Sequence, residues 1–162
     1  MVFSTISSII SLIFFQLEGD KSFVITNWIS SGSLNVDWSL NFNLLTVTMI
    51  IMVNFVSTLI HIYSVGYMSK DPRRIIFMGY LGLFTFFMLF LVSSSNLIQL
   101  FVGWEGVGLT SYLLIGFWSH KDEANKASLK AFVANRVGDF GLLISLFTIF
   151  IVFESPRHVM SR

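Results

Sequence analysis

The sequence predicts an all-α membrane protein, a polytopic bundle of about five transmembrane helices, and three observations lead to this prediction. Hydrophobic residues make up 54% of the 162 residues, and charged residues make up 12%, which is about half the share found in a soluble domain. The mean hydropathy is +0.77. Apolar runs of membrane-spanning length alternate with short polar links. We therefore expect a single membrane domain over residues 1–162.

Five apolar segments account for the predicted helices. The first is short for a transmembrane helix, and the fifth carries Asn135, Arg136 and Asp139 in its first turns. The link at residues 94–96 is very short, so the third and fourth segments should form an antiparallel helical hairpin. The predicted segments cover about residues 2–17, 42–66, 75–93, 97–118 and 134–153.

A longer polar stretch, residues 18–41, separates the first two apolar segments. Hydrophobic and polar residues alternate over residues 34–38, and this period of two is typical of a strand. We expect a short hairpin here, lying at the membrane interface.

The lysines and arginines of the polar links predict the orientation of the chain. Cytoplasmic or matrix-side loops carry an excess of these residues. We therefore expect the side with six of them to face the matrix or cytoplasm, together with the N-terminus, and the C-terminus to lie opposite. The six are Lys70, Arg73, Arg74, Lys121, Lys126 and Lys130, against Lys21, Arg157 and Arg162 on the other side.

The composition argues against several classes of function. Cysteine is absent, so the chain has no disulfide framework and no thiolate metal site. The net charge of +1 gives no reason to expect a nucleic-acid partner. We recognise no phosphate-binding loop, no His/Cys metal constellation and no nucleophile beside a base, so we expect no catalysis by the isolated chain and no bound cofactor. The N-terminus lacks the basic residues of a signal or transit peptide, and we expect the chain to begin with a membrane segment.

Glu105 is the main candidate for a functional residue. It lies about 12 Å along a helix that begins at Leu97, inside a hydrocarbon core about 30 Å thick. A charge at that depth costs at least about 2.5 kcal/mol, so an intramembrane acid suggests ion or proton movement, the alternative being a structural ion pair. Three glycines, Gly103, Gly106 and Gly108, surround it. They either allow close helix packing or leave room for water or a cation beside the carboxylate.

Five further side chains are candidates with two interpretations each. Arg136 and Asp139 are three residues apart and share a helix face. They form either a capping cluster at the start of the fifth segment, where the helix dipole favours an acid, or part of a charge pathway. His61, near the end of the second segment, can titrate near neutral pH. It either relays protons or is a hydrogen-bonded packing residue. On a predicted amphipathic helix over residues 124–131, Lys126 and Lys130 are either surface anchors or buried bases.

Several motifs occur in a fixed order along the chain. They are HIYSVGYM at 61–68, DP at 71–72, FTFFM at 84–88, NLIQLFVGWEGVG at 96–108, SYLLIGFW at 111–118 and NRVGDFG at 135–141. Over about residues 28–148 the sequence resembles the N-terminal part of the subunit 5 family of mitochondrial NADH dehydrogenase, the antiporter-like subunit of respiratory complex I.

The resemblance implies a partial antiporter-like fold and proton translocation driven by quinone reduction elsewhere in the complex. The family's key acid corresponds to Glu105, and its neighbouring carboxylate corresponds to Asp139, with Arg136 beside it. In the family the glutamate pairs with a lysine on a later, broken helix. The resemblance also implies the mitochondrial inner membrane as the location. NADH, FMN, iron–sulfur clusters and ubiquinone would bind elsewhere in the complex, and no cofactor would bind this chain.

Three departures from the family bear on the partners of the chain. The family has one more helix before the first segment, Asn43 stands where the family usually has Asp, and the chain ends near the end of the family's sixth helix. We therefore expect a second chain to supply the missing helices, besides the other complex I membrane-arm subunits and membrane lipids. Glu105, Arg136 and Asp139 lead to the same expectation, because unpaired charges in a bilayer need a partner to supply cations or water.

Two other functions stay open at this point. The chain could be a structural membrane-arm subunit that pumps nothing, or a subunit of a sodium–proton antiporter, whose large subunits resemble the same family. In the leading interpretation the chain is part of an enzyme, the proton-translocating NADH:ubiquinone reductase.

Overall fold

The structure is a computed structural model that describes residues 1–31 and 34–159. Helices dominate the described residues, as the predicted fold class requires, and a two-stranded antiparallel sheet follows the first helix. In chain order the elements are α1 (Val2–Glu18), β1 (Lys21–Ser31), β2 (Leu34–Phe42), α2 (Leu44–Tyr67), α3 (Arg74–Val92), α4 (Leu97–Ile115) and α5 (Asp122–Val159).

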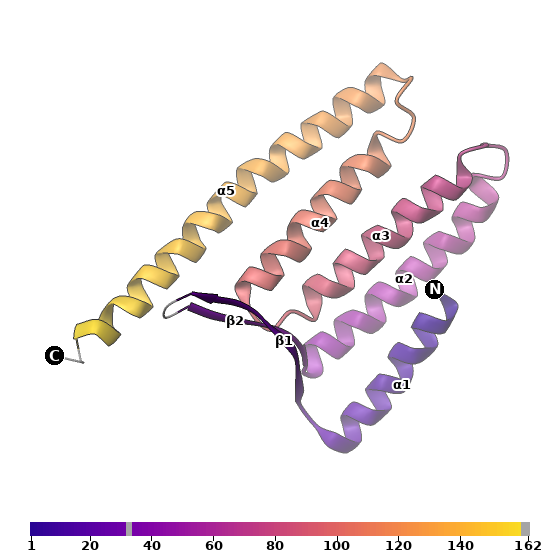
Figure 1. The fold of residues 1–162 in the computed structure, drawn as a ribbon. Coiled ribbons are helices and arrows are strands. Elements are labelled where there is room, and N and C mark those ends of the chain that lie inside the picture. Colours follow the sequence, from indigo (N-terminus) through magenta and orange to yellow (C-terminus); the bar gives the residue numbers. More distant parts are fainter. Residues whose placement is uncertain (32–33, 160–162) are drawn as a thin grey trace.

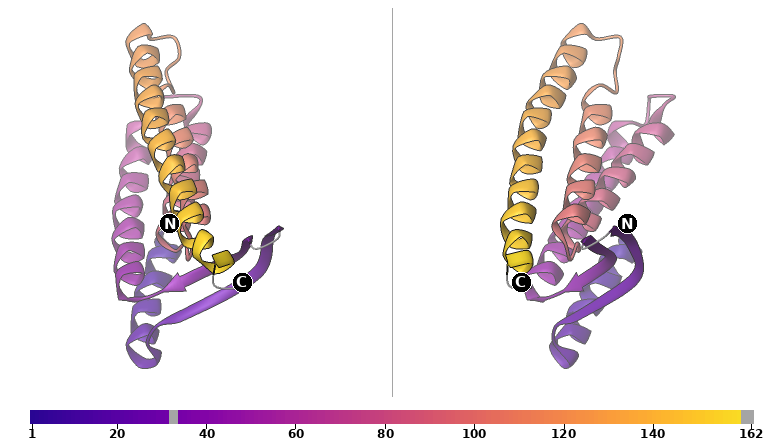
Figure 2. Two further views of the ribbon diagram at one scale, coloured as in Figure 1. Left: turned by 90° about the vertical axis from the view of Figure 1, so that its left-hand side faces the viewer. Right: turned by 60° about the vertical axis from the view of Figure 1, so that its left-hand side comes forward.

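The helices lie side by side in chain order and form a single row (Figure 1). Each helix packs mainly on the helix that precedes it and the one that follows it. Seen from its edge, the row is a narrow layer, and the two strands run across its end (Figure 2). The broad faces of the helices therefore stay open, and only 6% of the apolar window of α3 and of α5 is buried.

Most of the buried side chains are polar, which is the reverse of a soluble core. Because the outer surface of a membrane protein faces apolar lipid, small and polar side chains mediate the contacts between helices. Among the described residues, the buried hydrophobic side chains are Val36, Val47, Met68 and Phe117, whereas the buried polar ones include Asn54, Ser57, Thr85, Gln99, Thr110 and Asp139.

Four helices of the described chain, α2 to α5, are long and apolar enough to cross a membrane. The predicted segments two to five are therefore confirmed as membrane-length helices, and α1 is shorter, as its sequence indicates. The links at residues 68–73 and 116–121 lie at one end of the row and the strands lie at the other (Figure 1). This arrangement agrees with the alternation of sides that the positive charges predict.

The position of α1 differs from the prediction. The Ser4 hydroxyl donates to Asn54 Oδ1 at 2.9 Å, so the first turn of α1 lies beside the middle of α2. Asn54 is thirteen residues, about 20 Å of helix, before Tyr67. The N-terminus of α1 therefore does not reach the end of the row where residues 68–73 lie, although we expected it on that side.

The start of the last helix also differs from the prediction. The predicted segment 134–153 and the predicted amphipathic helix 124–131 are one continuous helix, α5. Good helix formers fill the join, and no glycine or proline occurs between Asp122 and Val137. Asp122 and Glu123 occupy the first turn, where negative charge is favoured by the helix dipole.

The predicted pairing of strands as a hairpin is confirmed and extends over most of the stretch between α1 and α2, whereas its position at the membrane interface stays a prediction. The strands pair in antiparallel register from Lys21 opposite Phe42, with irregularities between Val24 and Thr26 and between Asn27 and Ile29. A hairpin alone is marginally stable in water, so its contacts with the helices matter.

Strand β2 is attached to the link between α3 and α4. The Asn41 N–H donates to the Ser93 carbonyl at 2.9 Å, and the Asn96 side chain donates to the Asp37 carbonyl at 2.8 Å. The fully buried Gln99 accepts a bond from the β2 backbone. These contacts hold the hairpin against the link between α3 and α4. Glu105, the main functional candidate, lies on α4.

Candidate functional site

Two glycines of α4 set how α4 sits against α3. A Cβ on Gly103 would lie 2.8 Å from the Leu91 Cα, and a Cβ on Gly106 would lie 2.2 Å from the Phe87 ring. Only a residue without a side chain allows this approach, so close packing explains these two glycines. A Cβ on Gly108 would make an ordinary contact of 3.5 Å with the Asn135 side chain. The face of α4 that carries Gly103 and Gly106 therefore packs on α3. The side chains of Trp104 and Glu105, on the same turns of α4, contact α5.

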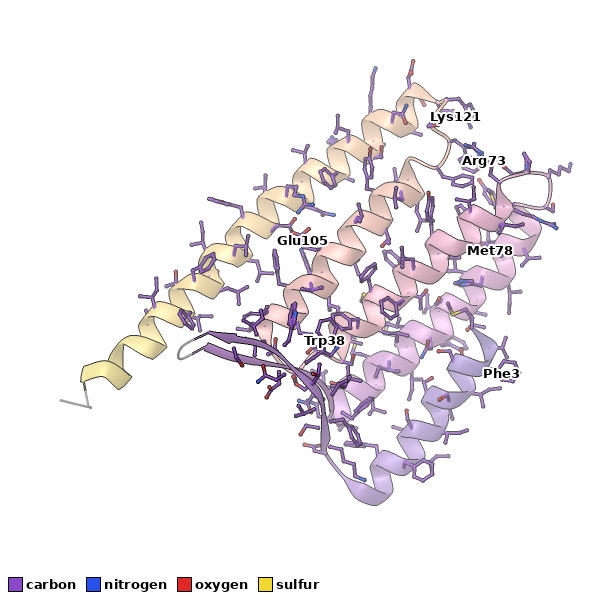
Figure 3. The ribbon with its side chains drawn as sticks, in the orientation of Figure 1. Phe3, Trp38, Arg73, Met78, Glu105 and Lys121 are labelled. Atoms are coloured by element: carbon purple, nitrogen blue, oxygen red, sulfur yellow. The ribbon has the colours of Figure 1, made fainter. Side chains whose placement is uncertain are left out.

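Glu105, Arg136 and Asp139 form one group between α4 and α5, which we call the charge cluster (Figure 3). Arg136 Nη1 donates to Glu105 Oε2 at 2.5 Å and lies 3.5 Å from Asp139 Oδ2. Trp104 Nε1 donates to the other oxygen of Asp139, Oδ1, at 2.8 Å. One guanidinium therefore bridges two carboxylates from different helices.

The three charged side chains differ in their exposure. The Asp139 side chain is 8% exposed, Glu105 is 25% exposed and Arg136 is 48% exposed. The guanidinium also lies 4.8 Å from the centre of the Phe132 ring, a cation–π contact. With two carboxylates and one guanidinium, the cluster carries one uncompensated negative charge when all three are ionised. A cavity of about 10 Å³ next to it has space for about one water molecule.

The position of Asp139 excludes the capping interpretation. Asp139 lies seventeen residues after Asp122, about 26 Å along α5, whereas the helix dipole acts within the first turn. Its carboxylate is stabilised by Trp104 and Arg136 instead. The bond from Trp104 could not be predicted from the sequence, because the two residues are 35 positions apart and an indole in an apolar segment is usually a packing residue.

We expected the three charges to have too few partners within the chain, and the described residues supply part of what these charges need. Arg136 forms ion pairs with both Glu105 and Asp139. What the charge cluster lacks is one further positive charge, because one guanidinium faces two carboxylates. A partner therefore needs to supply one positive charge beside the two carboxylates, which is less than the sequence indicated.

His61 is not part of the charge cluster. Its Nδ1 lies 2.8 Å from the Ser57 carbonyl of its own helix and 3.3 Å from the Ser57 hydroxyl, which in turn bonds to the Thr85 hydroxyl of α3 at 2.6 Å. These contacts belong to the α2–α3 interface and favour the packing interpretation of His61. Lys126 and Lys130 are exposed, as surface anchors would be. The described residues contain no group of three His, Cys, Asp or Glu side chains that could hold a metal ion.

A row of membrane-length helices with an ion pair between two of them defines a polytopic membrane protein with a charge site between helices. Two family profiles match the chain, and together they include more than half of it. Residues 28–78 match the N-terminus of NADH-ubiquinone oxidoreductase (complex I) chain 5, and residues 94–155 match the transmembrane region of NADH:quinone oxidoreductases and Mrp antiporters. The chain belongs to the chain 5 family of antiporter-like complex I subunits.

Individual relatives agree with this assignment. The chain is 51% identical over 157 residues to NADH-ubiquinone oxidoreductase chain 5 of Chondrus crispus, covering 94% of this chain and 24% of that protein. It is 50% identical over 158 residues to chain 5 of Acanthamoeba castellanii, covering 96% and 23%. It is 48% identical over 160 residues to NADH-quinone oxidoreductase subunit L of Rickettsia bellii, covering 96% and 25%. The chain thus spans about a quarter of the length of these relatives.

Proposed function

We propose that this chain takes part in proton translocation by NADH:ubiquinone oxidoreductase, as the N-terminal portion of its antiporter-like chain 5. The charge cluster is the observation that carries the proposal, because it places an acid, a fixed cation and a second acid at the contact of two membrane-length helices. Charges at that depth are costly and mark ion or proton pathways.

The three side chains differ in what they can do chemically. Arginine stays protonated in proteins, so Arg136 acts as a fixed positive charge and not as a proton carrier. A carboxylate can bind and release a proton, so Glu105 and Asp139 are the groups that can change charge. Glu105 is the more accessible of the two, and Asp139 is held by an indole N–H as well as by the guanidinium. We therefore assign the proton-responsive role to Glu105 and the positioning of Arg136 to Asp139.

The bridging geometry suggests how a change at Glu105 alters the charge cluster. Arg136 Nη1 is close to Glu105, at 2.5 Å, and farther from Asp139, at 3.5 Å. If a proton or a second cation neutralises Glu105, the guanidinium loses its nearer partner and its attraction to Asp139 dominates. A lysine from the part of the subunit beyond this chain would be such a cation and would supply the missing positive charge. Arg136 would then move between two discrete ion pairs.

The setting follows from the family. In this proposal the chain lies in the mitochondrial inner membrane beside lipids, other membrane-arm subunits and the remaining helices of chain 5. NADH, FMN, iron–sulfur clusters and ubiquinone are bound elsewhere in the complex. The contacts of the charge cluster also favour a second candidate, a structural subunit that does not pump, because the Arg136–Glu105 ion pair and the Trp104–Asp139 hydrogen bond both join α4 to α5.

Glu105→Gln distinguishes these two functions. The substitution keeps the shape of the side chain and removes its charge. In complex reconstituted into vesicles, the number of protons pumped per NADH should fall clearly, while NADH oxidation with an artificial acceptor in the peripheral arm stays near normal. Glu123→Gln, the same change at the exposed start of α5, is the matched control and should leave pumping unchanged. Equal pumping in the Glu105→Gln and control variants would contradict the role of Glu105 in proton translocation and support the structural function.

A further inference from the structure

A second polar cavity lies away from the charge cluster, at the end of the row where residues 116–121 join α4 to α5. Its volume is about 300 Å³. Its walls come from the first turns of α3, the last turn of α4 and the first turns of α5, and they include Arg73, Tyr80, Tyr112 and Asn125. Arg73 and Lys121 lie at this end of the row in Figure 3.

The cavity presents hydrogen-bond donors that are not used within the described residues. The Arg73 guanidinium lies 5.0 Å from the centre of the Phe117 ring but forms no hydrogen bond and no ion pair with the described part of the chain. The hydroxyls of Tyr80 and Tyr112 likewise have no hydrogen-bond partner there; the Tyr112 ring packs on Phe132 at 5.4 Å. Arg73, Tyr80 and Tyr112 therefore line the same space, and a ligand that supplies acceptor oxygens could bond to their free donors.

The donors are arranged by depth in the membrane. Arg73 directly precedes α3, so it lies at the surface end of that helix. Tyr80 lies seven residues later, about 10 Å deeper. Tyr112 lies within the last turn of α4, on the neighbouring helix. The cavity thus extends from the headgroup level into the membrane, and tyrosines at such depths are typical of the membrane interface.

We infer that this cavity binds the phosphodiester headgroup of an anionic membrane phospholipid, in preference to a zwitterionic one. Arginine presents two parallel N–H groups that match a phosphate, and it forms stronger bonds with an anion than neutral donors do. In this inference the phenol hydroxyls donate to the ester carbonyls below the phosphate. The apolar side chains of Ile76, Leu113 and Phe117 line the same cavity and suit the start of an acyl chain.

Charge near the cavity supports an anionic ligand. Lys70 and Lys121 lie on the two links at this end of the row and Arg74 begins α3, so with Arg73 there are four positive side chains here against Asp71, Asp122 and Glu123. The nearby acid, Asp71, accepts bonds from the Arg73 backbone N–H at 2.8 Å and from the Trp118 indole at 3.1 Å. Both of its oxygens already accept a hydrogen bond; the Arg73 guanidinium attracts this carboxylate electrostatically but forms no hydrogen bond with it among the described residues, so its N–H groups stay available for a phosphate.

The test uses the chain in its native membrane assembly, transferred to nanodiscs of phosphatidylcholine. The probe is a phosphatidylglycerol with a photoreactive diazirine near the start of one acyl chain, added at low mole fraction. Crosslinked peptides are identified by mass spectrometry. We expect crosslinks on the peptides that contain Ile76 and Leu113, and we expect excess unlabelled phosphatidylglycerol to remove them.

Two arginine variants give the matched comparison. Arg73→Gln should lower these crosslinks about tenfold or more, because it removes charged hydrogen bonds to the phosphate. Arg74→Gln loses the same charge one residue away, at an exposed position outside the cavity, and should leave the crosslinks unchanged. Should Arg73→Gln fail to assemble, the double change Tyr80→Phe with Tyr112→Phe keeps both rings, removes both hydroxyls and should also reduce the crosslinks.

Three results would overturn the inference. An equal loss in both arginine variants would show attraction by surface charge in general. Displacement of the probe by millimolar inorganic phosphate as effectively as by phosphatidylglycerol would identify a soluble anion as the ligand. Absence of crosslinks at these peptides in the unmodified chain would show that another protein segment fills the cavity.

Discussion

Replacing Trp104 with Phe tests whether the indole holds Asp139 in the charge cluster. The change removes the N–H that donates to Asp139 Oδ1 at 2.8 Å and keeps an aromatic ring. Asp139 is 8% exposed, and its remaining partner, Arg136, lies at 3.5 Å. A hydrogen bond to a buried charged group contributes about 1.5–3 kcal/mol. For a chain of this size, a loss of about 2 kcal/mol lowers Tm by about 4–8 °C.

A double-mutant cycle separates the hydrogen bond from the loss of ring volume. Thermal unfolding of the detergent-solubilised protein is followed by helical circular dichroism for Trp104→Phe, for Asp139→Ala and for both changes together. The smaller ring affects the single and the double variant alike, so the coupling energy reports the bond. We expect a coupling of about 1.5–3 kcal/mol. A coupling below about 0.5 kcal/mol, the level of independent sites, would refute the reasoning.

The chain offers a matched control for this substitution. Trp118 also donates its indole N–H to a carboxylate, that of Asp71, at 3.1 Å. Asp71 lies in a link outside the membrane-length helices, where water can replace the lost donor. Trp118→Phe should therefore lower Tm less than Trp104→Phe.

Three further predictions concern packing, pH and topology. Gly106→Ala should lower Tm by an overpacking cost of about 1–3 kcal/mol, because its Cβ would overlap a phenyl ring of α3, whereas Gly108→Ala should change Tm little. The hydrogen bond from the Arg73 backbone N–H, and then the bond from the Trp118 indole, lower the pKa of Asp71 below its usual value. The ionised Asp71 therefore stabilises the folded chain at pH values above its pKa in the unfolded chain, and this stabilisation is lost as the pH falls through its pKa in the folded chain. Tm measured against pH should therefore differ between the unmodified protein and Asp71→Asn near neutral pH and converge in acid; a constant difference would contradict this. Because the chain has no cysteine, single cysteines at Ser22 and Ser69 should react with an impermeant maleimide from opposite sides of the membrane, and labelling of both from one side would exclude the orientation.

The helices could be predicted because apolar length is a local property of the sequence. The segments near residues 42–66, 75–93 and 97–118 correspond to α2, α3 and α4, and the alternation at 34–38 identified the hairpin. The start of α5 was placed too late because residues 122–133 are polar, and a search for apolar length overlooks a polar helical extension. Composition favoured a helix there, yet nothing local showed that it continues into the membrane segment.

The partners within the site could not be predicted in the same way. Glu105 and Arg136 were each recognised from their depth or spacing, but their contact joins residues 31 positions apart. It depends on the rotation of α4, which the close approach of Gly103 and Gly106 to α3 determines. Rotation and register of packed helices depend on many side chains at once. A single sequence therefore reveals the candidates more readily than the pairs.

The arrangement of helices in one row has a consequence for how the chain folds. Helices that contact mainly their neighbours in sequence give a low contact order, so each can dock soon after it enters the membrane. The attachment of β2 to the α3–α4 link is the exception, because it joins Asn41 to Ser93 and Ser39 to Gln99, across more than fifty residues. The hairpin is made early and must wait until α4 has been inserted. Its docking would then be a late event that marks completion of the first four helices.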